Sequence, residues 1–147
     1  MLANQIGYYS LILGLIFSIL ICAVSIKDFN TSSKQINQSI LSLSFTQLVL
    51  IIISFLGLIL SFVNSDFGNE TVFNNSHTTK PLFYKISGTW GNHEGSLLLW
   101  LLVLTLFIFI FLISSREQPK RYRILTLLFQ QIIIIGFFLF VLMTSNP

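Results

Sequence analysis

The sequence has 147 residues, of which 54% are hydrophobic and 9% are charged. An ordinary soluble domain carries about 25% charged residues, so this composition argues against a water-soluble globular protein. The formal net charge is +3, but the basic residues fall between long apolar runs, which argues against nucleic acid as a partner. The single cysteine, Cys22, lies inside an apolar run and is expected to act as a small hydrophobic residue.

Four apolar runs free of Asp, Glu, Lys, Arg and His are close to the length that crosses a membrane. A hydrocarbon core about 30 Å thick needs about 20 helical residues. The runs cover residues 6–26, 40–63, 97–113 and 124–143, and the third needs Ser96 or Ser114 to complete its span. We therefore expect an all-α integral membrane protein, one membrane domain over residues 1–147, with transmembrane helices at about 6–26, 40–63, 96–114 and 124–143. The first run is expected to stay as a transmembrane helix, because neither a basic segment before it nor a small-residue cleavage site marks a signal peptide.

The distribution of basic residues predicts the orientation. Six cations fall in the short connections at 27–39 and 115–123, whereas the longer connection at 64–95 contains only Lys80 and Lys85. By the positive-inside rule the two basic connections face the cytoplasm or matrix. Both termini and the 64–95 connection then lie on the other, non-cytoplasmic side.

The two halves of the 64–95 connection differ in composition. Residues 64–79 are rich in Asn, Ser and Thr, which favours a surface loop. Residues 80–90 interleave aromatic and aliphatic residues with two lysines, which is typical of a segment lying at the membrane surface with its amines reaching outward. Two matches to glycosylation acceptors, at Asn69 and Asn74, are expected by chance in an Asn-rich chain.

The segment from Thr89 to Trp100 combines polar and aromatic groups at the start of the third span. One interpretation is structural: Asn92 or Ser96 caps the helix, Glu94 lies near its positive end, the tryptophans anchor the interface, and Gly91 and Gly95 admit a neighbouring helix. The other is functional: His93 and Glu94, held between Trp90 and Trp100, form a lip that binds a flat aromatic ligand or its propionates. His93 as an axial metal ligand is a weaker form of this hypothesis, and His77 is weaker still.

Residues 90–100 resemble a pattern of the CcmF family, the membrane subunit of the cytochrome c haem lyase, which carries WGxHEGSxLLW at the start of its third helix. The matching positions are Trp90, Gly91, His93, Glu94, Gly95, Ser96, Leu98, Leu99 and Trp100. The segments Pro81–Lys85 and Thr144–Pro147 agree as well. The helix order and loop sizes resemble the amino-terminal part of that family over essentially the whole chain.

The resemblance implies a part in attaching haem b to apocytochrome c in a bacterial or, preferentially, a mitochondrial inner membrane. It also implies partners: chains carrying the rest of the lyase, a haem chaperone, apocytochrome c and membrane lipid. Family members are several times longer and carry a tryptophan-rich segment and further haem-ligating histidines, which this chain lacks, so neither His77 nor His93 takes their place by match. The chain therefore resembles the amino-terminal piece of a split lyase and is expected to be a non-catalytic part of it.

Polar and small residues inside the apolar runs are candidate contacts for partner helices. They are Thr46, Ser54, Gln130, Gln131, Gly7, Gly14, Gly57 and Gly136. The glutamines are expected either to bond to a partner chain or to pair within this bundle. A different functional class also stays open, namely a structural subunit of a larger inner-membrane respiratory assembly. A transporter or channel subunit is disfavoured because no ionisable residue of the kind that lines a transport path lies inside an apolar run.

Overall fold

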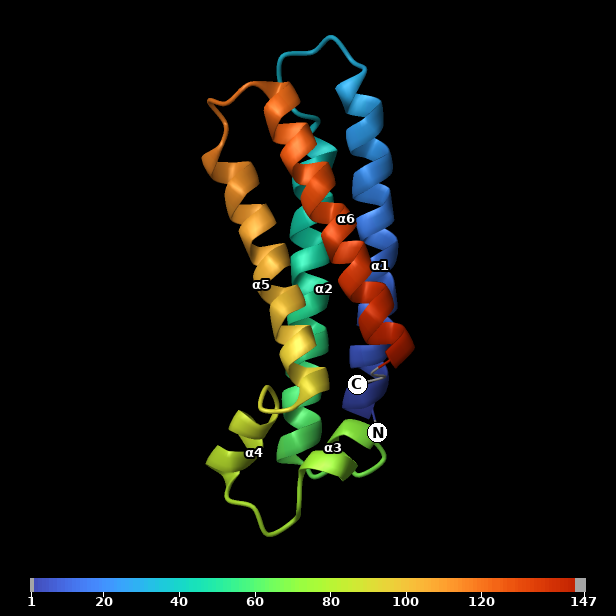
Figure 1. The fold of residues 1–147 in the computed structure, drawn as a ribbon, viewed down its shortest axis with the longest axis vertical. Coiled ribbons are helices and arrows are strands. Elements are labelled where there is room, and N and C mark those ends of the chain that lie inside the picture. The colour runs from blue at the N-terminus through green and yellow to red at the C-terminus, as the bar shows by residue number, and fades with distance from the viewer. Residues whose placement is uncertain (1, 145–147) are drawn as a thin grey trace.

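The computed structural model describes residues 2–144, and within them all regular structure is helical (Figure 1). The helices are α1 (Leu2–Phe29), α2 (Gln38–Val63), α3 (Glu70–Asn75), α4 (Leu82–Gly88), α5 (His93–Ser114) and α6 (Lys120–Thr144). The four long helices α1, α2, α5 and α6 are apolar and long enough to cross a membrane, which confirms the predicted fold class. Each contains the corresponding apolar run and extends beyond it into polar residues. Residues 145–147 of the carboxyl-terminal motif lie outside the described part.

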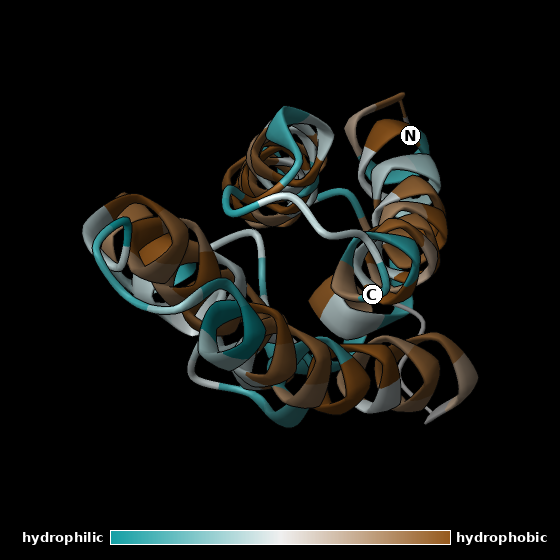
Figure 2. Ribbon diagram, turned by 90° about the horizontal axis from the view of Figure 1, so that it is seen from above, coloured by the Kyte–Doolittle hydropathy of each residue, from teal (hydrophilic) through white to brown (hydrophobic). Residues whose placement is uncertain are grey.

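The four long helices form an antiparallel bundle in which α1 packs on α2 and α6, and α5 packs on the same two helices. The short helices α3 and α4 lie at the end where α1 begins and α6 ends, and the two basic connections lie at the other end (Figure 1). Hydrophobic residues dominate the helices, and hydrophilic residues concentrate in the connections (Figure 2). The two basic connections thus share one end of the bundle and the 64–95 connection lies at the other, as the predicted orientation requires. The side of the membrane that each end faces stays a prediction.

Glycines set the close approach of α1 to its neighbours. A Cβ atom at Gly57 would lie 2.9 Å from the Ala3 carbonyl oxygen and 3.3 Å from the Gly7 Cα. A Cβ at Gly14 would lie 2.8 Å from the ring of Phe138 on α6. At Gly57 the two backbones approach this closely because no side chain intervenes, as is common between membrane helices, whereas at Gly14 an aromatic ring packs on the backbone. Three of the four predicted glycine contacts are therefore used inside the bundle, whereas a Cβ at Gly136 would have no neighbour within 4 Å.

A fully buried polar junction joins three helices in the middle of the bundle. Ser18 on α1 donates a hydrogen bond of 2.5 Å to the Gln131 Oε1 on α6. Gln131 Nε2 donates to Gln47 Oε1 on α2 over 3.1 Å, and Gln47 Nε2 donates back to the Ser18 hydroxyl over 3.0 Å. The neighbouring Gln130 donates to the Leu104 carbonyl oxygen at 3.4 Å. Both glutamines thus pair within this bundle, which was one of the two expectations for them.

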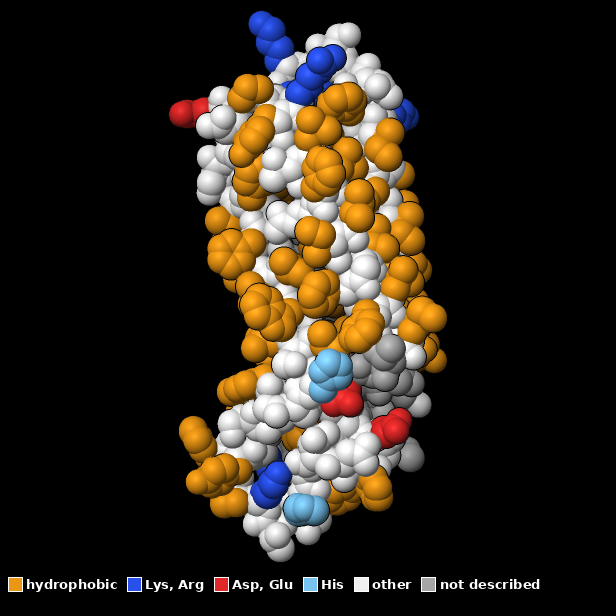
Figure 3. Space-filling model, viewed as in Figure 1, with side chains coloured by type: hydrophobic (Ala, Val, Ile, Leu, Met, Phe, Trp, Pro, Cys, Tyr) orange, Lys and Arg blue, Asp and Glu red, His pale blue; other side chains and the backbone are white. Residues whose placement is uncertain are grey.

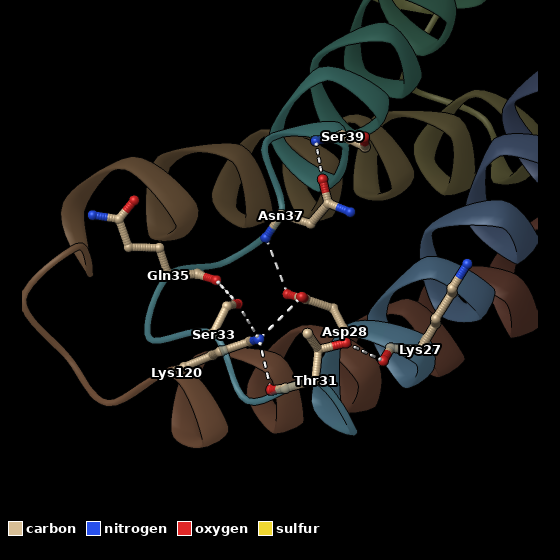
Figure 4. Close-up of polar contacts among 8 residues, drawn as sticks. All are labelled: Lys27, Asp28, Thr31, Ser33, Gln35, Asn37, Ser39 and Lys120. Atoms are coloured by element: carbon tan, nitrogen blue, oxygen red, sulfur yellow. Dashed lines mark hydrogen bonds and ion pairs between the residues drawn. The ribbon is translucent and has the colours of Figure 1, made fainter.

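An ion pair closes the basic end of the bundle (Figure 4). Lys120 Nζ lies 3.0 Å from Asp28 Oδ1, and both side chains are largely buried. Asp28 also accepts a hydrogen bond of 3.0 Å from the Asn37 backbone N–H, and Asn37 in turn caps α2 by accepting from the Ser39 N–H. Lys120 donates further to the Thr31 carbonyl oxygen. One carboxylate therefore ties together the end of α1, the start of α2 and the start of α6.

Candidate functional site

The candidate site begins with a tight turn between α4 and α5. Asn92 adopts an extended backbone conformation and caps α5, with its Oδ1 accepting a 2.6 Å hydrogen bond from the Gly95 N–H. Its Nδ2 donates to the Gly88 carbonyl oxygen at 2.8 Å and to the Thr89 carbonyl oxygen at 3.3 Å. A capping Asn side chain satisfies an N–H group that the first helical turn leaves unpaired. The structural interpretation of Asn92 is thus confirmed, whereas Ser96 bonds back to the His93 carbonyl oxygen.

Gly95 is required by this turn rather than by a neighbouring helix. A Cβ atom at Gly95 would overlap the carbonyl oxygen of Thr89, which is itself completely buried. A Cβ at Gly91 would lie 3.3 Å from the Ser87 carbonyl oxygen. At both glycines the nearest atoms belong to the end of α4 and the turn after it, and not to another transmembrane helix. The α4–α5 connection folds back on itself at both positions, a contact that spacing along the sequence does not reveal.

His93 and Trp100 lie on one face of α5, seven residues and nearly two helical turns apart. Phe107 follows at the same spacing, and both aromatic residues are more than half exposed. The His93 ring meets the ring of Phe140 on α6 edge-on, with centroids 6.3 Å apart. Aromatic side chains of α5 and α6 therefore lie together, with the His93 imidazole at one end. The spacing of residues along α5 could not predict that Phe140 of α6 joins them.

Glu94 lies on a different side of α5 from His93 and Trp100. It follows His93 by one residue, or about 100° around the helix, and shares its register with Leu101, which is completely buried. Within residues 2–144 the Glu94 carboxylate makes no hydrogen bond or ion pair. The helix therefore brings His93 and Trp100 to one face and Glu94 to another, while Trp90 lies 42% exposed in the connection before α5.

The segment before the turn exposes apolar side chains and holds its two amines in hydrogen bonds to the 64–95 connection. Phe83 and Tyr84 on α4 are 77% and 62% exposed, as expected for rings at a membrane surface. Their lysine neighbours do not reach outward as predicted. Lys80 Nζ donates to the Asn75 carbonyl oxygen at 2.8 Å, and Lys85 Nζ donates to the Ser65 hydroxyl at 2.7 Å. Both amines therefore bond to oxygens of the folded connection.

The first half of the connection is anchored rather than loose. Asn69 caps α3 through its Oδ1, which accepts from the Thr71 N–H. Its Nδ2 donates to Asn4 Oδ1 on α1 over 3.0 Å. This buried amide is committed to two helices, which fits the expectation that the glycosylation pattern at Asn69 is a chance match, whereas Asn74 is exposed.

Within residues 2–144 these groups do not form a preassembled metal centre. Indole and phenyl faces stack on planar π systems, and a neutral imidazole can coordinate iron or accept a hydrogen bond. In the part of the chain between residues 2 and 144, no three His, Cys, Asp or Glu side chains gather where they could hold a metal ion. His77 is exposed between α3 and α4 and is not brought to His93. A haem at this face would therefore meet one imidazole, that of His93, and the indole of Trp100.

Comparisons with known proteins identify relatives along nearly the whole chain. The sequence is 38% identical over 141 residues to the cytochrome c-type biogenesis protein CycK of Bradyrhizobium diazoefficiens, covering 96% of this chain and 21% of the relative. It is 34% identical over 143 residues to the cytochrome c-type biogenesis protein CcmF of Haemophilus influenzae, covering 97% of this chain and 22% of the relative. No family model matches the sequence. The chain thus spans about a fifth of the length of these relatives.

A solved structure has the same fold. It is described as the cytochrome c haem lyase CcmF, and it superimposes with a TM-score of 0.86 over 99% of this chain and 24% of its own. The sequence identity is 24%. This likeness therefore supports the four-helix arrangement.

Proposed function

We propose that this chain, a homologue of the CcmF-type cytochrome c biogenesis proteins, is a membrane subunit of a cytochrome c haem lyase and helps to attach haem to apocytochrome c. The observation that carries the proposal is the alignment of 96% of the chain with a cytochrome c-type biogenesis protein at 38% identity. The chain spans about a fifth of the length of these relatives, and the proposed partners include chains that carry the rest of the lyase. The chain contributes scaffold and a site for contact with haem.

The contact site in this proposal is the lip formed by Trp90, His93, Glu94 and Trp100. Haem b bound at the lip would supply the porphyrin vinyl groups to which the apocytochrome thiols add. Trp100 offers its exposed indole to the macrocycle, and His93 offers its imidazole beside the ring of Phe140. Glu94, unpaired within the described residues, is placed to receive a basic group of a partner chain.

The proposal also includes the membrane in which the chain lies and the partners that reach it. A multi-pass chain of this family is placed in an inner membrane, and we favour the mitochondrial one. A haem chaperone delivers haem to the lip from the non-cytoplasmic side, where the 64–95 connection is predicted to lie. Apocytochrome c arrives from the same side, and the exposed apolar faces of the four spans meet lipid or the completing chains.

The test measures the yield of holocytochrome c in cells that express variants of the complete lyase complex. His93→Ala and Glu94→Gln are each expected to lower the yield while the complex still assembles. Two matched controls remove the same groups elsewhere: His77→Ala replaces an exposed histidine of the 64–95 connection, and Glu70→Gln replaces the first-turn acid of α3. Neither control is expected to alter the yield.

A pull-down in mild detergent, with an absorption spectrum of the eluate, separates the two parts of the proposal. Recovery of haem and lyase chains together with normal yield in both lip variants would contradict the role of the lip alone. Recovery of this chain in a respiratory complex, with normal cytochrome c maturation after its deletion, would contradict the lyase role and favour a structural subunit.

A further inference from the structure

A polar pocket opens at the basic end of the bundle, and neither Asp28 nor Lys120 lines it. It lies between the start of α2 and the α5–α6 turn, and its lining includes Gln35, Gln38, Leu41, Leu112, Arg116 and Arg123. Figure 3 shows that most visible Lys and Arg side chains gather at this end of the molecule. Asn37 also lines the pocket, and its backbone N–H donates to Asp28, so the pocket and the ion-pair network adjoin at this residue. In Figure 4 the Gln35 side-chain amide points away from the network.

The two arginines give the pocket a positive charge that no acid of its lining offsets. Arg123 is largely buried; its Nε donates to the Ser115 hydroxyl at 3.0 Å, and its Nη2 donates to the Leu112 carbonyl oxygen at 2.6 Å. These bonds hold the guanidinium in place and leave Nη1 without a hydrogen bond to any described residue. Arg116 is exposed and makes no ion pair within residues 2–144. A held guanidinium beside a second one is suited to an anion with several oxygens, such as a phosphate group.

The wall below the arginines is apolar and continues along the bundle. Leu41 and Leu112 line the pocket. One turn further along α2 lies Phe45, which is 52% exposed, and its ring contacts Phe109 of α5 at a centroid distance of 5.4 Å. A ligand with a phosphate head and an acyl chain can therefore place its head at the arginines and its chain along the α2–α5 surface.

We infer that this pocket binds the headgroup of an anionic phospholipid. Basic pockets between transmembrane helices commonly bind such headgroups. A second basic region, formed by Lys34, Lys120 and Arg121, is less suited, because Lys120 is engaged by Asp28 and Arg121 lies 5.5 Å over the Phe29 ring. The pocket is at the opposite end of the bundle from the lip, so this inference does not depend on the haem-lyase proposal.

The test titrates the purified full chain in mild detergent with phosphatidylglycerol or phosphatidylcholine and counts retained lipid by native mass spectrometry. We expect phosphatidylglycerol to be retained preferentially, and Arg116→Gln to weaken its retention about fivefold, the effect of removing one basic residue near a membrane surface. Arg121→Gln removes the same charge outside the pocket and is expected to change retention less than twofold. Gln38→Glu places an acid in the pocket and should weaken retention, whereas Gln118→Glu, in the α5–α6 turn outside the lining, should not.

Three outcomes would overturn the inference. Equal retention of the two lipids would mean that the arginines select no anionic headgroup. Equal losses in Arg116→Gln and Arg121→Gln would mean a diffuse charge effect rather than a site. Displacement of phosphatidylglycerol by millimolar inorganic phosphate would mean that the pocket recognises a free anion and that the acyl chain contributes nothing.

Discussion

The Ser18 hydroxyl on α1 donates directly to the Gln131 side-chain oxygen on α6, although the two residues are 113 positions apart in the chain. Both side chains are completely buried, and Gln47 of α2 completes their hydrogen bonds. Apolar helices in lipid can slide and rotate at little cost because the lipid is as apolar as their surfaces. A polar junction of this kind selects one arrangement of α1, α2 and α6, since any other leaves amide groups without partners.

Gln131→Leu is expected to lower the free energy of unfolding of the chain by about 1–2 kcal/mol, because it leaves the Gln47 amide incompletely bonded. Denaturation in mixed detergent micelles measures this change. The combined variant Ser18→Ala, Gln47→Leu and Gln131→Leu removes every polar member and should recover part of the loss. If the triple variant is less stable than the sum of its single losses predicts, the junction does not act as described.

Asp28→Ala is expected to destabilise the basic end, because it leaves the Lys120 ammonium and the Asn37 N–H without the carboxylate that they share. A double-mutant cycle with Lys120→Met should give a coupling energy of about 0.5–3 kcal/mol, as found for residues in one ion-pair network. Lys27→Met removes an exposed cation one residue away and provides the control. Additive losses in the cycle would show that the pair contributes nothing beyond its separate contacts.

Gly57→Ala is expected to reduce thermal stability in detergent, by about 1–3 kcal/mol, since its Cβ would press on the Ala3 carbonyl and force α1 and α2 apart. Gly136→Ala is the matched control on α6, where a Cβ meets open space. The control should be neutral or stabilising because alanine favours a helix over glycine. Equal melting temperatures for the two variants would argue against the close approach of α1 to α2.

Gly95→Ala is expected to displace the turn before α5 and weaken the Asn92 cap, because its Cβ has no room beside the Thr89 carbonyl. Hydrogen exchange of the backbone amides at 95–97 should become faster, and the yield of holocytochrome c should fall with it. Gly91→Ala meets a milder contact, 3.3 Å from the Ser87 carbonyl oxygen, and should show a smaller change. Unchanged exchange in Gly95→Ala would show that the turn can relax at no cost.

The predicted orientation can be checked with single cysteines in a Cys22→Ser background. Asn74→Cys in the 64–95 connection and Glu117→Cys in the α5–α6 turn are both exposed positions. A membrane-impermeant maleimide should label the first only from the non-cytoplasmic side and the second only from the cytoplasmic or matrix side. Labelling of both from the same side would contradict the arrangement in which the two connections lie at opposite ends of the bundle.

Much of the helical architecture was predictable because each determinant is local. Four uncharged runs of spanning length are visible in the sequence alone, and the hydrocarbon core leaves such a run little alternative to a helix. The Asn92 cap was among the expectations for the same reason, since its hydrogen bond reaches only three residues along the chain. The motif around His93 was also recognisable, because a family pattern is a property of consecutive residues.

Contacts between distant segments were decided by the tertiary structure. Three of these contacts depend on which segments the fold brings together. Gln131 pairs with Ser18 and Gln47. Lys80 and Lys85 bond within the connection, and Phe140 lies beside His93. Spacing along one helix shows which residues share a face, but not what that face meets. The sequence by itself thus determined the spans and the motif, whereas only the packed bundle decided which polar groups are paired, which glycines lie against a neighbouring backbone and where the aromatic face lies.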